Sequence, residues 1–192
     1  REMSDLALYC VRNDIVGQGN RLLFQAKDKV QEADDRISIF WAYYSGFEDE
    51  QSAKSFLDAL KGNETSSTQE LQIAEVYRYL INDRRLAEES LFRAEKLSKT
   101  TEDTFLLAES YRSLFGNENQ SDGELESGLQ KVTGAFSEKF DHLQDLVSRF
   151  GLCSPIRSWL REQVQKVDTP QDCAQLSKYC SRLGENDLVV SL

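Results

Sequence analysis

Few side chains in this sequence are suited to nucleophilic chemistry. It has one histidine, His142, and four cysteines, of which Cys153 is the nearest to that histidine. A thiol beside an imidazole base is one form of activated nucleophile. The residues around the pair provide no third group to orient the imidazole and no loop to stabilise an oxyanion. We therefore expect His142 on the polar side of an amphipathic helix and Cys153 near a helix start, without a catalytic role.

Other catalytic and ligand-binding motifs are absent from the sequence. It contains no C-x-x-C, no H-E-x-x-H, no G-x-G-x-x-G and no phosphate-binding loop of the Walker type. A single histidine also leaves an ordinary zinc site short of ligands. The acidic runs Glu48–Glu50 and Glu88–Glu89 fit solvated turns and polar helix faces better than acid–base catalysis. We expect no enzyme activity, no cofactor and no metal site.

Composition is typical of an ordered domain, and the negative net charge disfavours anionic partners. The chain is 40% hydrophobic and 29% charged, with a net charge of −10, which argues against nucleic acid or an anionic membrane surface as a partner. No apolar run approaches the about 18 residues that a membrane span needs. The cysteines suggest free thiols in a reducing, cytoplasmic compartment. Because the chain starts Arg1-Glu2-Met3, we expect it to be part of a longer protein.

The strongest pattern is a spacing of 34 residues that relates several residue types. Tyrosines follow it, with one position taken by Asp145: Tyr9, Tyr43, Tyr77, Tyr111 and Tyr179. Large apolar residues follow it too: Leu23, Leu57, Leu91, Leu125 and Trp159. Two further series hold mainly small residues: Gly19, Ala53, Ala87 and Ser121, then Ala26, Leu60, Ala94 and Gly128. A step of this length is typical of tandem helix-turn-helix units, each of which buries its apolar face against the next.

The sequence therefore predicts an all-α protein, an α-α superhelix (solenoid) of about five to six stacked hairpins in a single repeat domain. In each unit the tyrosine lies in the first helix and the leucine in the second. The expected units lie near residues 1–33, 34–67, 68–101, 102–135, 136–168 and 169–192.

Turn and cap residues predict several helix boundaries. Asn82-Asp83 separates the two helices of the third unit, and Thr169 with Pro170 begins the sixth. In the fourth unit we expect a long turn from Gly116 to Gly123, with Ser121 and Glu124 forming a capping box for the second helix. Pro155 opens the second helix of the fifth unit and Asp187 that of the sixth. In the first unit the turn runs from Asn13 to Gly19.

The order of residue sizes resembles the tetratricopeptide repeat. Ala74, Tyr77, Ala87, Leu91 and Ala94 match that family's order in the third unit, as do Ala108, Tyr111, Ser121, Leu125 and Gly128 in the fourth. The units are degenerate: the turn is about one residue longer than the family norm, and the family's glycine before the tyrosine, early tryptophan and closing proline are missing. The resemblance implies a module without catalytic residues that binds proteins in a concave groove lined by the first helices.

Five residues are candidates for binding a partner in that groove. They flank the tyrosines of the first helices, and they are Trp41, Tyr44, Arg78, Tyr79 and Arg112. The aromatic residues suit an anchoring role, because large rings bury much area at a small cost in entropy.

The two arginines have two interpretations. Arg78 and Arg112 are 34 residues apart, so stacking would place them about 10 Å apart, where they could clamp a carboxylate. Alternatively, each pairs with a glutamate of its own helix, Glu75 or Glu109, at i, i+3 spacing. The asparagines and lysines of the chaperone-tail clamp known in some tetratricopeptide proteins are absent.

Two functions fit these expectations. The first is a non-catalytic scaffold that binds a peptide or a protein segment in its groove. The second is a helical regulatory or sensor segment of a larger enzyme or signalling protein, packed on other domains of the same chain. Neither requires nucleic acid, membrane insertion or a metal.

Overall fold

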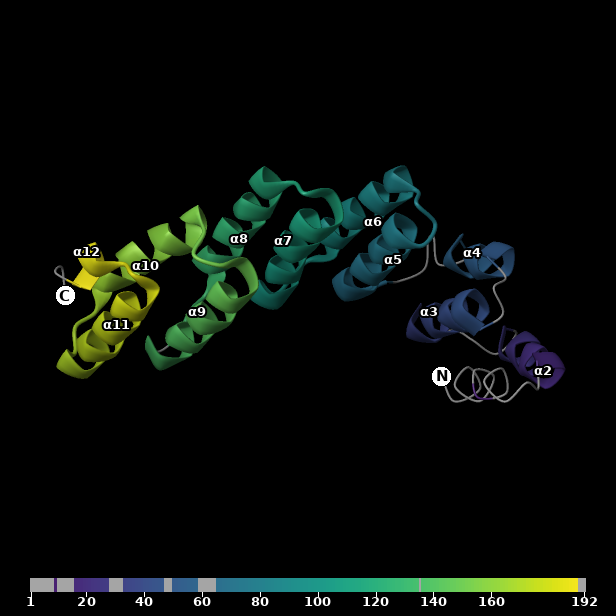
Figure 1. Cartoon of the computed structure of the whole chain (residues 1–192), viewed down its shortest axis with the longest axis horizontal. Coiled ribbons are helices and arrows are strands. Elements are labelled where there is room, and N and C mark those ends of the chain that lie inside the picture. Colours follow the sequence, from purple (N-terminus) through teal and green to yellow (C-terminus); the bar gives the residue numbers. More distant parts are fainter. Residues whose placement is uncertain are drawn as a thin grey trace. The chain divides into compact units, whose positions relative to one another are not determined.

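The structure is a computed structural model, and it describes residues 9, 16–27, 33–46, 50–58, 65–134 and 136–189. Within these ranges every regular element is helical, so the expected all-α class is confirmed for the described part of the chain (Figure 1). The helices are α2 (Val16–Lys27), α3 (Ala33–Trp41), the π-helical turn η1 (Ala42–Gly46), α4 (Glu50–Asp58), α5 (Ser67–Tyr79), α6 (Arg84–Leu97), α7 (Thr101–Phe115), α8 (Glu118–Lys131), α9 (Phe136–Phe150), α10 (Ser154–Lys166), α11 (Pro170–Leu183) and α12 (Asn186–Val189).

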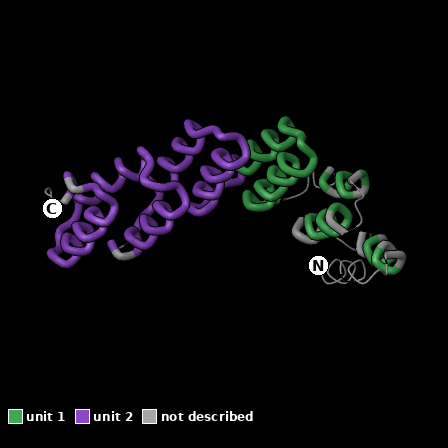
Figure 2. Tube along the Cα trace, in the orientation of Figure 1, with its two compact units in different colours: residues 1–94 green, residues 95–192 purple. Residues whose placement is uncertain are grey.

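The chain divides into two compact units (Figure 2). Unit 1 comprises residues 1–94 and unit 2 residues 95–192, so the division falls inside α6. In unit 1, α3 packs against α4, and in unit 2, α7 packs against α8 and α11 against α12. Successive helices therefore pair as hairpins, as the 34-residue pattern predicts.

The leucine series forms part of the core. All five of its members are buried: Leu23, Leu57, Leu91, Leu125 and Trp159. The small residues Ala53, Ala87, Ser121 and Ala94 are buried as well. Small side chains at these positions let the two helices of a hairpin approach closely, so the second-helix face predicted from the spacing is confirmed at these positions.

The tyrosine series is less uniform. Tyr43 and Tyr77 are buried, whereas Tyr9 is exposed, which differs from the expected packing role. Tyr111 is half-buried, and its hydroxyl donates a hydrogen bond of 3.1 Å to Glu95. Burial, reinforced by the Glu95 carboxylate, raises the pKa of Tyr111 well above its usual range. This hydroxyl therefore remains a proton donor throughout the physiological range.

The helix boundaries confirm some of the expected turns and correct others. Thr169 caps α11 by accepting from the Asp172 amide, and Pro170 occupies the first turn, as predicted. The prediction of a long turn from Gly116 to Gly123 is wrong. Gly116 ends α7 in the left-handed region at φ 61°, and Asn117 caps α8 immediately by accepting from the Gln120 amide. Ser121 is consequently a buried residue inside α8 and cannot form the predicted capping box with Glu124.

Part of the turn expected in the first unit is helical instead. Val16 and Gly19 both lie in α2, where Gly19 is buried, while residues 13–15 lie outside the described ranges. In the third unit, by contrast, Asn82 adopts a left-handed φ of 54°, and Asp83 follows it directly before α6. The predicted break at these two residues is confirmed.

An ion pair between a buried carboxylate and a half-exposed arginine joins α5 to α6 in unit 1. The Glu70 carboxylate is buried and accepts from the Arg93 guanidinium at 3.0 Å and from the Thr65 hydroxyl at 2.7 Å. Beside it, the Ser67 hydroxyl donates to the Ala94 carbonyl at 3.0 Å. These polar groups satisfy one another, and they fix the register of the two helices.

Unit 2 has one continuous apolar core. It extends from Phe105 on α7 to Leu188 on α12 and includes residues of every helix of this unit after α6. Within it, Gly128 of α8 lies against Phe105. A Cβ atom added at Gly128 would come within 2.5 Å of the Phe105 ring, which is itself buried. The close approach of α7 and α8 therefore depends on the absence of a side chain at residue 128.

We expect Gly128→Ala and Gly123→Ala to change stability in opposite directions, although both lie in α8. At Gly128 the clash with Phe105 costs about 1–3 kcal/mol, which outweighs the about 0.5–1 kcal/mol gained from the helix propensity of alanine. At Gly123 nothing lies within 4 Å of the added Cβ, so only the gain of about 0.5–1 kcal/mol remains. Thermal unfolding of the two variants measures both effects. Stabilisation by Gly128→Ala would contradict this packing.

Candidate functional site

The histidine and the cysteine considered for nucleophilic chemistry are both in unit 2. His142 is exposed on α9, and Cys153 precedes α10 as its N-cap residue, which confirms the two expected positions. Burial raises the pKa of the Cys153 thiol above its ordinary value, although a backbone hydrogen bond from Ile156 opposes this shift. A nucleophilic cysteine needs the opposite shift, because the thiolate is the reactive form. This environment therefore disfavours Cys153 as a nucleophile.

No set of three or more histidine, cysteine or acidic side chains within the described ranges could hold a metal ion. Nor does any helix among the described residues have the length and apolar character to cross a membrane. Cys153, Cys173 and Cys180 are free thiols, and Cys10 lies outside the described residues.

We expect EDTA to leave the thermal midpoint of the chain unchanged, because the described residues form no cluster that could hold a metal ion. Differential scanning fluorimetry with and without the chelator is a direct measurement. A clear drop in the midpoint that added zinc reverses would reveal a metal site.

The candidate aromatic residues Trp41 and Tyr44 are both anchored on a buried ring in unit 1. The Phe40 ring is fully buried, and it contacts Trp41 edge-on at 5.6 Å and stacks on Tyr44 at 5.7 Å between ring centroids. Trp41 is nevertheless 43% exposed. Tyr44 lies in the π-helical turn η1, a distortion that occurs frequently at functional sites. These two rings are held in place by packing while part of their surface faces solvent.

The next pair of candidates, Arg78 and Tyr79, forms the C-terminal end of α5. Arg78 is half-buried and Tyr79 is 62% exposed. Helix α5 contacts α3, the helix that ends at Trp41. Four of the five candidates therefore lie in unit 1, on α3, on the turn η1 that follows it and on the neighbouring helix α5: Trp41, Tyr44, Arg78 and Tyr79. We call these four residues the aromatic surface.

The fifth candidate, Arg112, belongs to unit 2, where it has a structural partner. Its guanidinium donates a hydrogen bond of 2.9 Å to the carbonyl of Phe150, the last residue of α9. A helix leaves its final carbonyls without internal partners, and a cation there also favours the helix dipole. Arg112 thus supports the end of α9, and the alternative pairing with Glu109 is not formed, because Glu109 binds Arg149.

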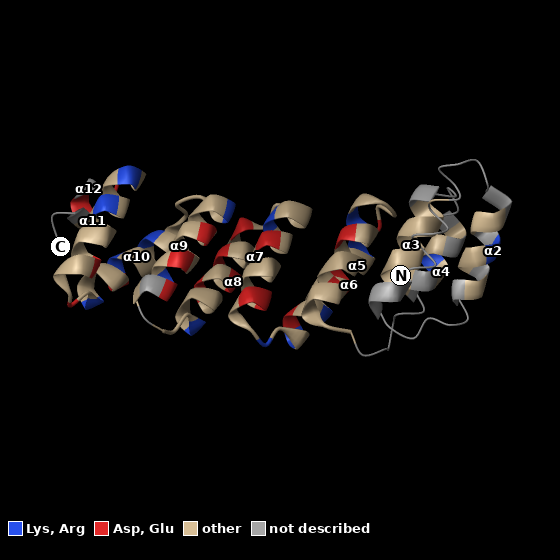
Figure 3. Ribbon diagram, turned by 90° about the horizontal axis from the view of Figure 1, so that it is seen from below, with Lys and Arg blue, Asp and Glu red and all other residues tan. Residues whose placement is uncertain are grey.

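Arg149 is a residue whose role we did not expect. It forms ion pairs with Glu109 at 2.8 Å, Asp145 at 3.2 Å and Glu102 at 3.3 Å, and so links α9 to α7. Figure 3 shows the acidic residues along α7 and α9. The only sequence signal was the i, i+4 spacing of Asp145 and Arg149. The residue at the tyrosine position of this unit, Asp145, therefore participates in an ion-pair network that includes both helices.

No family model, curated protein or solved structure matches this chain. The likeness to the tetratricopeptide repeat therefore rests on the residues described above.

Proposed function

We propose that this chain is a non-catalytic scaffold of stacked helix-turn-helix hairpins, similar to the tetratricopeptide family, that binds a peptide or protein segment. The aromatic surface of unit 1 carries the proposal. Large apolar side chains exposed beside one another mark interaction sites, and aromatic residues with arginine are the types that contribute most to binding energy. Here Trp41 and Tyr79 are exposed on neighbouring helices.

The surface also has features that favour recognition over non-specific adhesion. Packing of Trp41 and Tyr44 on Phe40 holds their rings before binding, which lowers the entropy lost when a partner docks. Arg78 adds a positive charge to a chain whose net charge is −10. A segment with apolar residues next to a carboxylate fits this combination.

A double variant, Trp41→Ala with Tyr79→Ala, tests the proposal. Immobilised wild-type chain should capture its partner from an extract of the source cells, and the double variant should capture at least about 10-fold less. Phe92→Ala is the matched control, because Phe92 is a similarly exposed aromatic residue, at 54%, on α6. All three proteins should have the same thermal midpoint.

Two outcomes would overturn the proposal. One is capture by the double variant at the wild-type level. The other is an equal loss with Phe92→Ala, which would indicate general stickiness of exposed rings. If further domains on the same chain abolish the capture that residues 1–192 show, those domains cover the aromatic surface, and the regulatory interpretation replaces the scaffold.

A further inference from the structure

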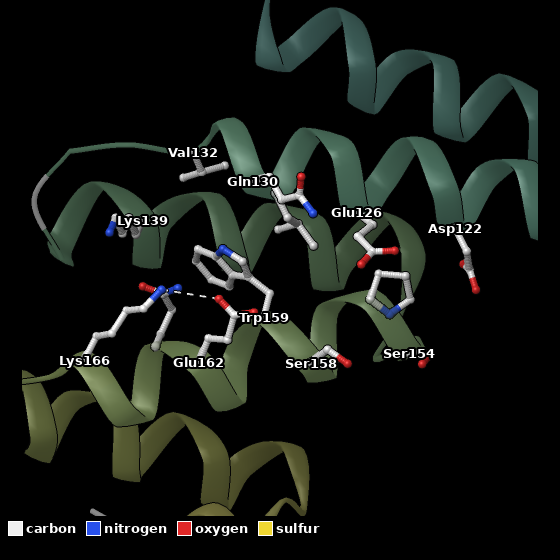
Figure 4. Close-up of a pocket in the computed structure, with 13 residues that line it drawn as sticks. Asp122, Glu126, Gln130, Val132, Lys139, Ser154, Ser158, Trp159, Glu162 and Lys166 are labelled. Atoms are coloured by element: carbon white, nitrogen blue, oxygen red, sulfur yellow. Dashed lines mark hydrogen bonds and ion pairs between the residues drawn. The ribbon is translucent and has the colours of Figure 1, made fainter.

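A groove of about 560 Å³ lies between α8 and α10 in unit 2. Helix α10 packs against both α8 and α9. Figure 4 shows the Trp159 ring in the middle of the groove, with charged side chains toward either end. We call it the α8–α10 groove. It is lined mainly by the second helices of two hairpins, with Lys139 contributed by the first helix α9.

Two buried polar side chains line this groove without hydrogen-bond partners. Trp159 is 8% exposed and Gln163 is 7% exposed, and both contribute to the groove wall. In the part of the chain that the structure describes, neither the indole N–H nor the side-chain amide has a hydrogen-bond partner. Buried polar groups are satisfied in the great majority of cases. The indole offers one donor, and the amide offers two donors and an acceptor, to a molecule bound in the groove.

Apart from Glu162, the charged residues of the groove are separated by sign. Figure 4 shows Asp122 and Glu126 toward one end and Lys139 and Lys166 toward the other. Lys166 pairs with Glu162 at 3.3 Å, whereas Asp122, Glu126 and Lys139 form no ion pair with other described residues. The two carboxylates, four residues apart on α8, also repel each other. A ligand with a cation at one end and an anion at the other would compensate these charges.

The length of the groove selects among such ligands. From Asp122 to Val132, at about 1.5 Å per residue, the α8 wall is about 15 Å long. A free amino acid is too short to reach both charged ends. An extended peptide, at about 3.3 Å per residue, covers this distance with about four to five residues. Its backbone amides match the donor and acceptor of the Gln163 side chain, and an apolar side chain fits against the Trp159 ring.

We propose that the α8–α10 groove is a second binding site, which takes an extended peptide segment with a basic residue at one end, an apolar residue in the centre and an acidic residue at the other end. The basic residue faces Asp122 and Glu126, and the acidic residue faces Lys139 and Lys166. The site is independent of the aromatic surface, because it lies in the other unit.

The two tryptophans of the chain allow the two sites to be observed separately. The probe is an end-blocked pentapeptide with lysine at one end, phenylalanine in the centre and glutamate at the other end. In ¹⁵N-correlated spectra of the full chain, this peptide should shift the indole resonance of Trp159 in a saturable way and leave that of Trp41 in place. A peptide with glutamate at both ends should bind about 5-fold more weakly, because one attraction becomes a repulsion. A shift of neither indole, or equal binding of the two peptides, would overturn the proposal.

Charge reversal on the protein provides a matched control. Glu126→Lys places a cation beside Asp122 and cancels the charge of the acidic end, so the preference should disappear and the two peptides should bind about equally. An unchanged preference would contradict the assignment of the acidic end. If the Trp159 resonance instead shifts with protein concentration alone, a second copy of the chain occupies the groove and the proposal is wrong.

Gln163→Leu distinguishes a binding role from a structural one. Leucine keeps most of the volume and removes an amide without a partner, so the thermal midpoint should stay the same or rise. Peptide binding should weaken about 3–10-fold through the lost hydrogen bonds. A lower midpoint with unchanged peptide affinity would show that the amide serves the fold, and would exclude it from the site. A failure here leaves the capture experiment with Trp41 and Tyr79 unaffected.

Discussion

Leu91→Ala should destabilise the chain by about 2–5 kcal/mol, the largest effect expected from a single truncation here. Leu91 is buried in α6 at the leucine position of the repeat. Alanine removes apolar side-chain surface that is buried on folding. It also leaves a cavity that the closely packed helices can fill only in part. Urea denaturation followed by circular dichroism should show a lower midpoint with an unchanged slope.

Glu88→Ala is the control, since it lies three residues earlier on the same helix. Glu88 forms an exposed i, i+4 ion pair of 2.8 Å with Arg84, and such pairs contribute less than about 0.5 kcal/mol. Comparable midpoint shifts for the two variants would mean that the buried face of α6 has been assigned to the wrong residues.

Glu70→Ala should lower the free energy of unfolding by about 2–3 kcal/mol, although it replaces a charged residue with an apolar one. The reason is burial of the Glu70 carboxylate, which accepts from Arg93 and from Thr65. Its removal leaves the Arg93 guanidinium without its carboxylate partner. Glu70→Gln should have an intermediate effect, because the amide oxygen still accepts from Thr65 but carries no charge.

The matched control for Glu70 is Glu89→Ala, which breaks the exposed Arg85–Glu89 pair of α6. It should change stability by less than about 0.5 kcal/mol. Raising the salt concentration should reduce the small effect at Glu89 more than the large one at Glu70, because buried charges are less screened. If chemical denaturation gives equal effects for the two variants, the Glu70–Arg93 pair has no special role.

The core of the second helices could be predicted from the sequence because its constraint repeats. Each leucine position must fill the space between two helices, so the same type of residue returns every 34 positions and becomes visible in one sequence. The cap at Thr169 depends on local residues only. The resulting prediction of class, of helix pairs and of the buried second-helix face required no knowledge of long-range contacts.

The functional features were less predictable because they do not repeat. Arg149 binds acidic residues of another helix, and no residue spacing in the sequence predicts such contacts. Gln163 was overlooked because a glutamine in a polar sequence predicts exposure, whereas the neighbouring helices bury it. The capping prediction at Ser121 failed because Gly116 and Asn117 provide an earlier stop and start.

The contact between Phe105 and Gly128 has a consequence for the exchange of helices between hairpins. In the preceding hairpin the corresponding residues, 34 positions earlier, are Leu71 and Ala94. One hairpin has a large ring and no side chain at these two positions, and the other has a medium side chain and a methyl group, both of them buried. A recombinant that joins the α7 sequence to the α6 sequence would set phenylalanine against alanine and overfill the interface. The opposite recombinant would leave a void. An exchange between repeats, whether natural or engineered, therefore preserves this packing only if both helices of a hairpin are moved together.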